Sequence, residues 1–258
     1  MTRHTTLSGA ALLDVVRATL TISVPDLDDH QTDTVTLWVA ATHAIHAWQH
    51  APRLVITSDC PASGKTRLLT ATAAVSCRPV FAAGSVSSLY HAMHPTLPTL
   101  FIDQVEQWLT RPAGTGESVR ALLVGGFTTT GTVARAVTGD DGRLRVVRDP
   151  VFGMAAMTTL TPLPDTLTTR SVVIRLSRMD TVRPLPPVPA RLPLLAADLL
   201  AWLDDDQPVL PGIDPPTPLS GRAAEVWRPL LAVADLAGQH WPDRAAAALS
   251  AASAHAAA

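Results

Sequence analysis

The segment RLVITSDCPASGKT (53–66) joins an apolar run to a loop that ends in Gly-Lys-Thr. The run RLVITS (53–58) predicts a buried strand, and the residues from Gly64 to about Ser76 predict a helix. This order is the context of a P-loop, in which backbone N–H groups and the N-terminus of a helix surround phosphates. The segment therefore predicts an α/β nucleotide-binding fold. The alternative is an ordinary connection between a strand and a helix.

The residues of this loop have separate predicted roles. We expect Lys65 to contact the β- and γ-phosphates of ATP and Thr66 to bind Mg²⁺. Further candidates for contact with the nucleotide are Asp59, Cys60, Pro61, Ala62, Ser63, Gly64 and Arg67. The loop departs from GxxxxGK[ST] at one position, because Asp59 stands where the first glycine is usual.

Lysine usage supports the P-loop. Of the 20 Lys and Arg residues, Lys65 is the one lysine and the other 19 are arginine. Together with the abundance of Ala, Thr and Pro, this usage is typical of a GC-rich genome in which arginine replaces lysine wherever either will serve. An ammonium on a flexible stem fits between phosphates in a way that the guanidinium fork does not. The lysine is thus retained where the predicted chemistry requires it.

A second strand, TLFIDQ (99–104), ends in a carboxylate and has the form of a Walker B strand. We expect Asp103 to bind the Mg²⁺ directly or through water, with a strand-end capping role as the alternative. Gln104 occupies the position at which most ATPases of this type have a glutamate. An amide orients water but accepts no proton, so Glu106 is the best local substitute for that base and Glu117 a poorer one.

Composition limits the other possibilities. The net charge of −2 gives no global case for nucleic-acid binding, so any DNA contact must come from a local patch. No apolar run is long enough to span a bilayer, and the N-terminus lacks a signal-peptide core, so we expect no membrane contact and a cytoplasmic location. Cys60 and Cys77 have no zinc spacing. His43, His46 and His50 share a predicted helical face without acidic or thiol ligands, which disfavours zinc.

The remaining pattern predicts an α/β core with helices at both ends. Helices are expected at 7–20, 34–49, 85–94, 117–124, 191–204, 221–237 and 243–256. Besides the strand at 98–103 that ends in Asp103, further strands are expected at 78–83, 151–160 and 170–176. A polar break is expected at 25–33, and proline-rich linkers at 180–190 and 207–218. An Asp-Gly turn within 131–149 predicts a β-hairpin. We expect a helical segment at 1–50, a P-loop NTPase core with a parallel sheet and inserted hairpin at 51–180, and a linker and helical region at 181–258.

Several segments carry a resemblance to a known family. They are PTLFIDQVE (98–106), GTVARAV (131–137), VFGMAAM (151–157), LPDTLTTRSVVIRL (163–176) and RAAEVWRPLLAVADLAGQHWPDRA (222–245). With the P-loop they resemble a family of P-loop proteins with a domain of unknown function from GC-rich bacteria, phages and mobile elements, often described as helicase- or primase-associated. The implied architecture is similar to the AAA+ and superfamily 3 helicase branch. Members usually carry Asp-Glu where this chain has Asp103 and Gln104.

The resemblance implies further roles. Thr158 or Thr159 would be a sensor of the γ-phosphate or of the attacking water, with a satisfied strand-end hydroxyl as the alternative. Arg170 would be an arginine finger that acts across a subunit boundary, with a surface arginine as the alternative. The hairpin would place Arg135, Arg143 and Arg145 on single-stranded DNA. Nearby aspartates cancel much of this charge, so a solvated hairpin is an equal alternative.

The sequence thus leads to one main hypothesis and one alternative. The main hypothesis is an ATP-Mg-binding homo-oligomeric ATPase, a motor or switch in DNA replication or in the processing of mobile-element or phage DNA. The alternative is a nucleotide-binding scaffold or regulator that does not hydrolyse ATP, which Asp59 and Gln104 favour. A small-molecule kinase is weaker, because no lid or acidic base follows the P-loop.

Overall fold

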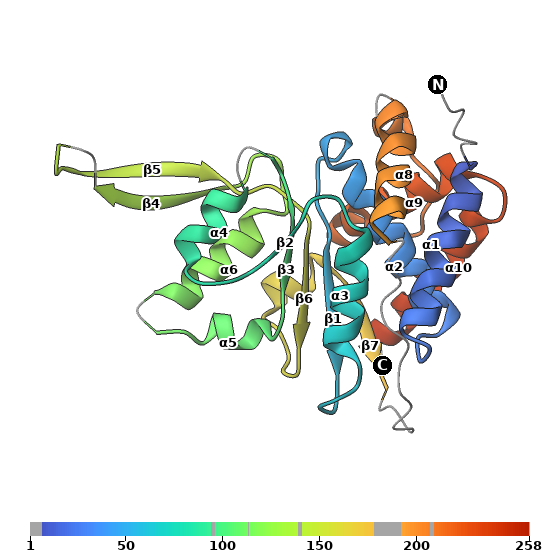
Figure 1. Ribbon diagram of the computed structural model, residues 1–258, viewed down its shortest axis with the longest axis horizontal. Coiled ribbons are helices and arrows are strands. Elements are labelled where there is room, and N and C mark those ends of the chain that lie inside the picture. Colours follow the sequence, from blue (N-terminus) through green and yellow to red (C-terminus); the bar gives the residue numbers. More distant parts are fainter. Residues whose placement is uncertain are drawn as a thin grey trace.

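The computed structural model describes residues 7–93, 96–112, 114–138, 141–177, 192–206 and 209–257. Its centre is a five-stranded, all-parallel sheet in the order β2-β3-β6-β1-β7 (Figure 1). The strands are β1 (Arg53–Ser58), β2 (Pro79–Phe81), β3 (Thr99–Ile102), β6 (Ala155–Thr159) and β7 (Ser171–Leu176). The three central strands are buried along almost their whole length, as is usual for a parallel sheet covered on both faces. The predicted α/β fold with a parallel sheet is confirmed.

Helices cover both faces of this sheet (Figure 1). The helices are α1 (Gly9–Ser23), α2 (Asp29–His43), α3 (Lys65–Val75), α4 (Val86–Met93), α5 (Val105–Leu109), α6 (Thr115–Gly125), α7 (Asp165–Thr168), α8 (Leu192–Asp205), α9 (Gly221–Ala237) and α10 (Trp241–Ala257), with short 3-10 turns at Ile45–Ala47 and Leu210–Gly212. Helices α4, α5 and α6 share one apolar cluster, and α1, α2, α3, α8, α9 and α10 share the other. None of the helices in the described ranges is both long and apolar enough to cross a membrane.

The N-terminal and C-terminal helices form one layer. Helix α10 packs against α2 and α9, and α9 packs against α2 and α1. Their apolar side chains belong to the same buried cluster as the P-loop helix α3. Segments at the two ends of the sequence therefore meet in space beside helix α3.

The predicted polar break at 25–33 is wrong over its second half. Helix α2 begins at Asp29, because Asp28 and Gln31 form a capping box. The Gln31 N–H donates to Asp28 Oδ1 at 2.7 Å, and the Asp28 N–H donates to Gln31 Oε1 at 3.3 Å. Asp29 then lies in the first turn, where its charge favours the helix dipole. The helix also ends at His43, six residues before the predicted end.

The predicted hairpin is present and projects from the body of the protein (Figure 1). It consists of β4 (Thr132–Thr138) and β5 (Leu144–Pro150), paired antiparallel. The short helices α5 and α7 were not predicted, because four or five residues are too few for a periodic pattern. The predicted strand at 151–160 is shorter than expected and begins at Ala155. The linker at 180–190 lies outside the described residues, and the one at 207–218 contains the turn Leu210–Gly212.

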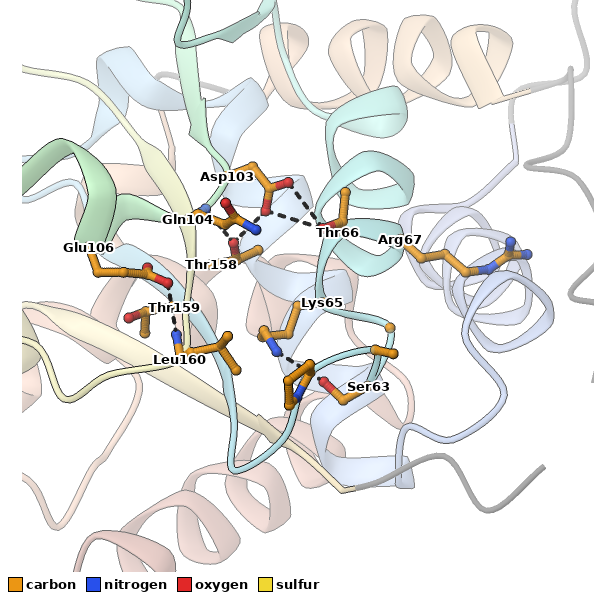
Figure 2. A pocket seen from close by; sticks show the side chains of 13 residues that line it. Ser63, Lys65, Thr66, Arg67, Asp103, Gln104, Glu106, Thr158, Thr159 and Leu160 are labelled. Atoms are coloured by element: carbon orange, nitrogen blue, oxygen red, sulfur yellow. Dashed lines mark hydrogen bonds between the residues drawn. The ribbon is translucent and has the colours of Figure 1, made fainter. Parts of the chain in front are cut away.

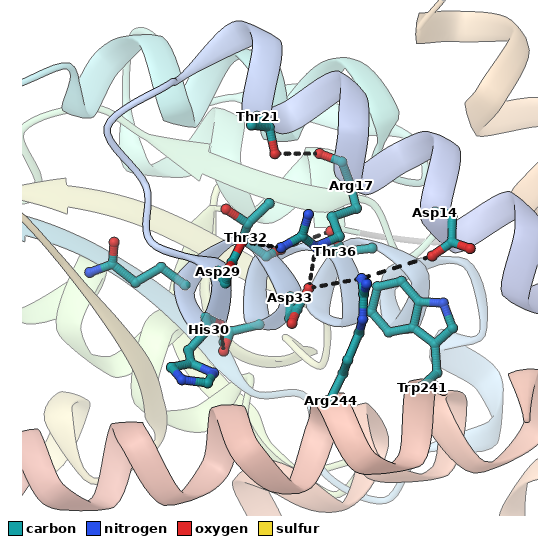
Figure 3. Close-up of polar contacts among 12 residues, drawn as sticks. Asp14, Arg17, Thr21, Asp29, His30, Thr32, Asp33, Thr36, Trp241 and Arg244 are labelled. Atoms are coloured by element: carbon teal, nitrogen blue, oxygen red, sulfur yellow. Dashed lines mark hydrogen bonds and ion pairs between the residues drawn. The ribbon is translucent and has the colours of Figure 1, made fainter. Parts of the chain in front are cut away.

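An ion-pair network joins the two ends of the chain (Figure 3). Asp33 on α2 is buried, and its Oδ1 accepts from Arg17 Nε of α1 at 2.5 Å. Arg244 Nη1 of α10 lies 3.6 Å from the same oxygen. Arg17 also pairs with the exposed Asp29. One buried carboxylate thus holds arginines from two other helices.

We expect Asp33→Ala to lower the free energy of unfolding by about 3 kcal/mol, because it leaves two part-buried guanidinium groups without their shared carboxylate. Asp29→Ala is the matched control: it removes another partner of Arg17, but that carboxylate is 86% exposed. Its effect should stay below about 1 kcal/mol. Urea titrations of both variants measure the difference, and equal losses would contradict a central role for Asp33.

Candidate nucleotide-binding site

The P-loop lies at the carboxyl end of β1 and leads into α3. Two of its residues adopt left-handed backbone conformations, Ala62 with φ 59° and Gly64 with φ 89°. Glycine adopts this conformation without strain, and Gly64 is the residue from which α3 starts. The first N–H groups of α3 have no partners within the helix, so they remain to bind an anion at the loop.

A pocket of about 400 Å³ opens beside this loop (Figure 2). It is lined by Pro61, Ala62, Ser63, Gly64, Lys65, Thr66, Arg67, Asp103, Gln104, Glu106, Thr158, Thr159 and Leu160. Three segments far apart in the sequence therefore meet here: the P-loop, the end of β3 and the end of β6. The volume lies in the range of small-molecule sites. Leu160 was not predicted, and an apolar residue after a strand gives no signal for such a role.

The Lys65 ammonium is held by neutral oxygens. Its Nζ donates to Ser58 Oγ at 2.6 Å, to the Cys60 carbonyl at 3.1 Å and to Ser63 Oγ at 3.2 Å. Within the described part of the chain it has no carboxylate partner, so its charge remains available for a phosphate. Ser58 was not singled out from the sequence; the available signal was a hydroxyl at the last position of the strand before the loop.

Thr66 and Asp103 are spaced as two ligands of one magnesium ion. The Thr66 hydroxyl donates to Asp103 Oδ2 at 3.0 Å and to Oδ1 at 3.2 Å. Neighbouring ligands of an octahedral Mg²⁺, each about 2.1 Å from the ion, lie about 3 Å apart. Mg²⁺ in nucleotide sites usually takes one or two protein ligands and completes its shell with phosphate and water. The hydroxyl and the carboxylate therefore fit this ion.

Thr158, one of the two predicted sensor threonines, contacts Asp103. Its hydroxyl donates to Asp103 Oδ1 at 2.5 Å and accepts from the Gln104 N–H at 2.7 Å. The Thr159 hydroxyl instead donates to the Thr161 carbonyl at 2.7 Å and accepts from the Thr161 N–H at 3.1 Å. Thr158 thus holds the carboxylate in place, whereas Thr159 closes a local turn.

The two candidates for the base differ in their surroundings. Gln104 has a left-handed backbone, with φ 53°, and its side-chain oxygen accepts from Gln107 Nε2. Glu106 Oε1 accepts from the Leu160 N–H at 3.4 Å, while Glu106 Oε2 is buried with no hydrogen-bond partner in the described residues. An unpartnered buried oxygen on the wall of a pocket is the kind of atom for which a water or ligand usually accounts. Glu117 lies on α6, outside the pocket lining.

Three of the predicted P-loop contacts have other partners. The Asp59 carboxylate pairs with Arg175 of β7 at 2.9 Å and does not line the pocket. Cys60 takes part through its carbonyl, which accepts from Lys65. Arg67 lines the pocket, but its Nε donates to the Ser23 carbonyl at the end of α1, and its side chain points away from Asp103 in Figure 2.

Arg170 lies at the opposite end of the sheet from the P-loop. Its carbonyl accepts from the Arg53 N–H at 2.9 Å, where β1 and β7 both begin. The P-loop follows the other end of β1, about 16 Å away at the usual rise per strand residue. The Arg170 Nη1 donates to the Thr166 carbonyl at 2.7 Å. Arg170 therefore cannot reach a nucleotide bound to its own chain.

Two of the three hairpin arginines predicted to contact DNA are paired within the hairpin. Arg135 forms an ion pair with Asp149, and its guanidinium lies 5.2 Å from the centre of the Tyr90 ring. Arg145 pairs with Asp141 at 2.6 Å. Arg143 follows the turn, and its backbone N–H donates to Asp141 Oδ1 at 3.2 Å. These pairs reduce the positive charge that the hairpin offers to a phosphate.

Among the three candidate histidines, His43 is a core residue, whereas His46 is exposed and His50 is partly buried. His43 is buried, and its Nε2 donates to the Val75 carbonyl at 2.8 Å. Burial lowers the pKa of His43 to about 4, so its ring is neutral at pH 7. Trp38 and Trp48 are also buried, and their N–H groups donate to the carbonyls of Pro52 and Ala41. None of these three residues lines the pocket.

Sequence comparisons cover the C-terminal part of the chain and a shorter stretch. Residues 182–258 match the family described as "Protein of unknown function (DUF3631)". A protein of Saccharopolyspora erythraea, "Uncharacterized 28.9 kDa protein in xis 5'region", is 50% identical over 54 residues. These residues are 21% of this chain and 20% of that protein, so the chain spans about a fifth of this relative.

Structural comparison finds distant similarity to a helicase. An X-ray structure of JCV helicase aligns with 78% of this chain and 64% of the helicase chain, at 14% identity and a TM-score of 0.37. An inhibitor-bound structure of JCV helicase aligns with 83% of this chain and 56% of that chain, at 16% identity and a TM-score of 0.36. The chain thus spans less than two thirds of either helicase chain. Its C-terminal region is similar to a family of unknown function, and its α/β fold is distantly similar to that of JCV helicase.

Proposed function

We propose that this chain binds ATP-Mg and hydrolyses it as an oligomeric P-loop ATPase. One observation carries the proposal: the lysine of the P-loop, a hydroxyl and a carboxylate spaced for Mg²⁺, and the threonine that orients the carboxylate all meet in one pocket. The described residues around the Lys65 ammonium offer it only neutral oxygens. A triphosphate supplies the negative charge that this arrangement lacks.

Each residue has a defined task in this proposal. Lys65 and the first N–H groups of α3 hold the β- and γ-phosphates. Thr66 and Asp103 would hold Mg²⁺, which when bound neutralises charge on the phosphate oxygens. Thr158 keeps Asp103 in the metal-binding rotamer through a hydrogen bond of 2.5 Å. Glu106 is the proposed base, because its buried Oε2 can accept a proton from water and the Gln104 amide cannot.

The proposal also includes DNA and a homo-oligomer. Arg170 lies too far from its own P-loop, so an arginine-finger role requires a neighbouring copy. The hairpin extends from the body, and Arg143 is its predicted DNA contact without an ion pair among the described residues. A motor or switch in DNA replication, or in the processing of mobile-element or phage DNA, is the function that combines these features.

A nucleotide-binding scaffold or regulator is the second candidate. The hydrogen bond from Gln107 to the Gln104 side chain favours the scaffold. This bond occupies the Gln104 oxygen that would otherwise orient the attacking water. ATP hydrolysis measured with and without single-stranded DNA separates the two candidates. Turnover that rises with DNA supports the motor, and binding without turnover supports the scaffold.

Nucleotide binding tests the proposal most directly. We expect Lys65→Ala to weaken the binding of a fluorescent ATP analogue by at least about tenfold, since a charge-assisted hydrogen bond contributes roughly 1.5–3 kcal/mol. The matched control is Arg111→Ala, which also removes one positive charge but lies over the Trp108 ring, outside the pocket lining. Equal affinity of the parent and Lys65→Ala would refute the P-loop assignment. Affinity independent of Mg²⁺ would refute the roles of Thr66 and Asp103.

A further inference from the structure

A cluster of two arginines and a histidine lies around Phe127 at the end of the sheet opposite the P-loop. The Phe127 ring is fully buried. The guanidinium carbons of Arg170 and Arg222 lie 5.8 and 5.0 Å from the ring centre, and the His50 ring centre lies 5.1 Å away. These residues come from three separate segments: the residue before β7, the first turn of α9 and the approach to β1. Tertiary packing alone brings them together.

The cluster carries more positive than negative charge. Arg53 lies beside it, fully buried, and donates to the carbonyls of Leu123, Ala51 and Gly153. Among the described residues, Glu225 is the carboxylate of the cluster; it pairs with Arg222 at 2.7 Å and lies 3.7 Å from His50. The cluster therefore holds three guanidinium groups and one carboxylate, which pairs with Arg222. The other arginine of α9, Arg228, has its own partner in Asp214 at 2.9 Å.

The pKa values of Arg170 and Arg53 indicate that the positive charges of the cluster repel one another. Burial and then the charge of Arg222 lower the pKa of Arg170. Burial, followed by the charge of Arg170, lowers the pKa of Arg53 to about 9. A group whose pKa is lowered in this way is destabilised in its charged form, so an anion between these arginines would offset the repulsion.

The two outer arginines also have the geometry to bind a phosphate. Arg170 uses Nη1 for the Thr166 carbonyl, and Arg222 uses Nη1 for Glu225. The hydrogen bonds that the structure shows thus leave Nε and Nη2 of both groups to bind a ligand. Both guanidinium groups lie within cation–π distance of one buried ring, and a guanidinium fork matches two oxygens of a phosphate.

We propose that Arg170 and Arg222 together form a phosphate-binding site that receives the terminal phosphate of ATP bound to a neighbouring copy of this chain. The proposal rests on the proposed function and deepens it by adding Arg222, from the C-terminal helical region, to the ATPase site. The pair lies at the end of the sheet opposite the pocket. Head-to-tail association brings two different surfaces of the same chain together, so this end can meet the pocket of the next copy.

Turnover kinetics test the role of Arg222. We expect Arg222→Ala to lower kcat at least about tenfold while KM and the affinity for a fluorescent ATP analogue stay unchanged, because the residue would act on the charge that develops at the transferred phosphate. Arg222→Lys should recover part of the rate, since it restores the charge without the fork. Arg228→Ala removes an arginine from the same helix and should retain the parent kcat. Identical kinetics for Arg222→Ala and Arg228→Ala would overturn the proposal.

A second measurement is independent of hydrolysis. Lys65→Ala removes the P-loop cation, so tripolyphosphate titrated into this variant in a calorimeter reports on the remaining site. We expect weak binding that is lost when Arg222→Ala is added and kept when Arg228→Ala is added. Tripolyphosphate binding with this pattern in a protein that shows no turnover would support the site while refuting the ATPase function. Loss of DNA binding in Arg222→Ala with unchanged turnover would assign the arginines to nucleic acid and overturn the proposal.

Discussion

Arg170→Ala should lower ATP turnover by about 10³-fold or more while nucleotide affinity remains at the parent value, as expected for loss of an arginine finger. The guanidinium would act on the negative charge of the transferred phosphate, and that charge develops after ATP has bound. Because Arg170 lies at the far end of the sheet from its own P-loop, the loss requires contact between copies. Turnover per chain in the parent should therefore rise with protein concentration.

Mixing two inactive variants gives the sharpest form of this prediction. Lys65→Ala lacks the P-loop cation and retains the finger, whereas Arg170→Ala retains the P-loop and lacks the finger. Some interfaces in a mixed assembly pair an intact pocket with an intact Arg170, so part of the activity should return. Arg170→Lys is the control for a loss of local structure, because its ammonium can still donate to the Thr166 carbonyl.

Two results would contradict the action of Arg170 across a subunit boundary. The first is a protein that remains monomeric with ATP and DNA present and still hydrolyses ATP at the full rate. The second is a mixture of the two variants that stays inactive although light scattering shows that they assemble together.

Glu106→Gln should lower turnover by about 10²–10⁴-fold, which is the usual contribution of a general base. The substitution preserves the shape of the side chain and its contact with the Leu160 N–H, but the amide cannot accept a proton. Glu117→Gln is the matched control, because that carboxylate lies on α6 outside the pocket and should leave the rate unchanged. Single-turnover measurements with excess enzyme separate this chemical step from product release.

Gln104→Glu gives a second test of whether Glu106 is the general base. It places a carboxylate next to Asp103, where most ATPases of this type carry their base. If Glu106 is the base of this protein, Gln104→Glu should restore turnover to Glu106→Gln. If Glu106→Gln and Glu117→Gln both keep the parent rate, neither Glu106 nor Glu117 accepts the proton.

The sequence by itself determined the local units of this protein. The apolar run before the loop, the helix after it and the retained Lys65 identified β1, the P-loop and α3. An apolar run that ends in Asp103 identified β3, and an Asp-Gly turn identified the hairpin. Each of these signals is a property of neighbouring residues, such as the spacing of apolar side chains or the backbone conformation that a turn requires. These units could therefore be predicted without knowledge of their packing.

Tertiary structure decided which side chains meet. Successive side chains of a strand point to opposite faces, so the register of β6 against β3 selects Thr158 rather than Thr159 as the partner of Asp103. The burial of Glu106 Oε2 depends on how the segment after Asp103 packs beside the end of β6. Arg170 and Arg222 lie near the same ring only because α9 packs against β7. No local pattern contains these contacts, because they depend on the packing of segments that are distant in the sequence.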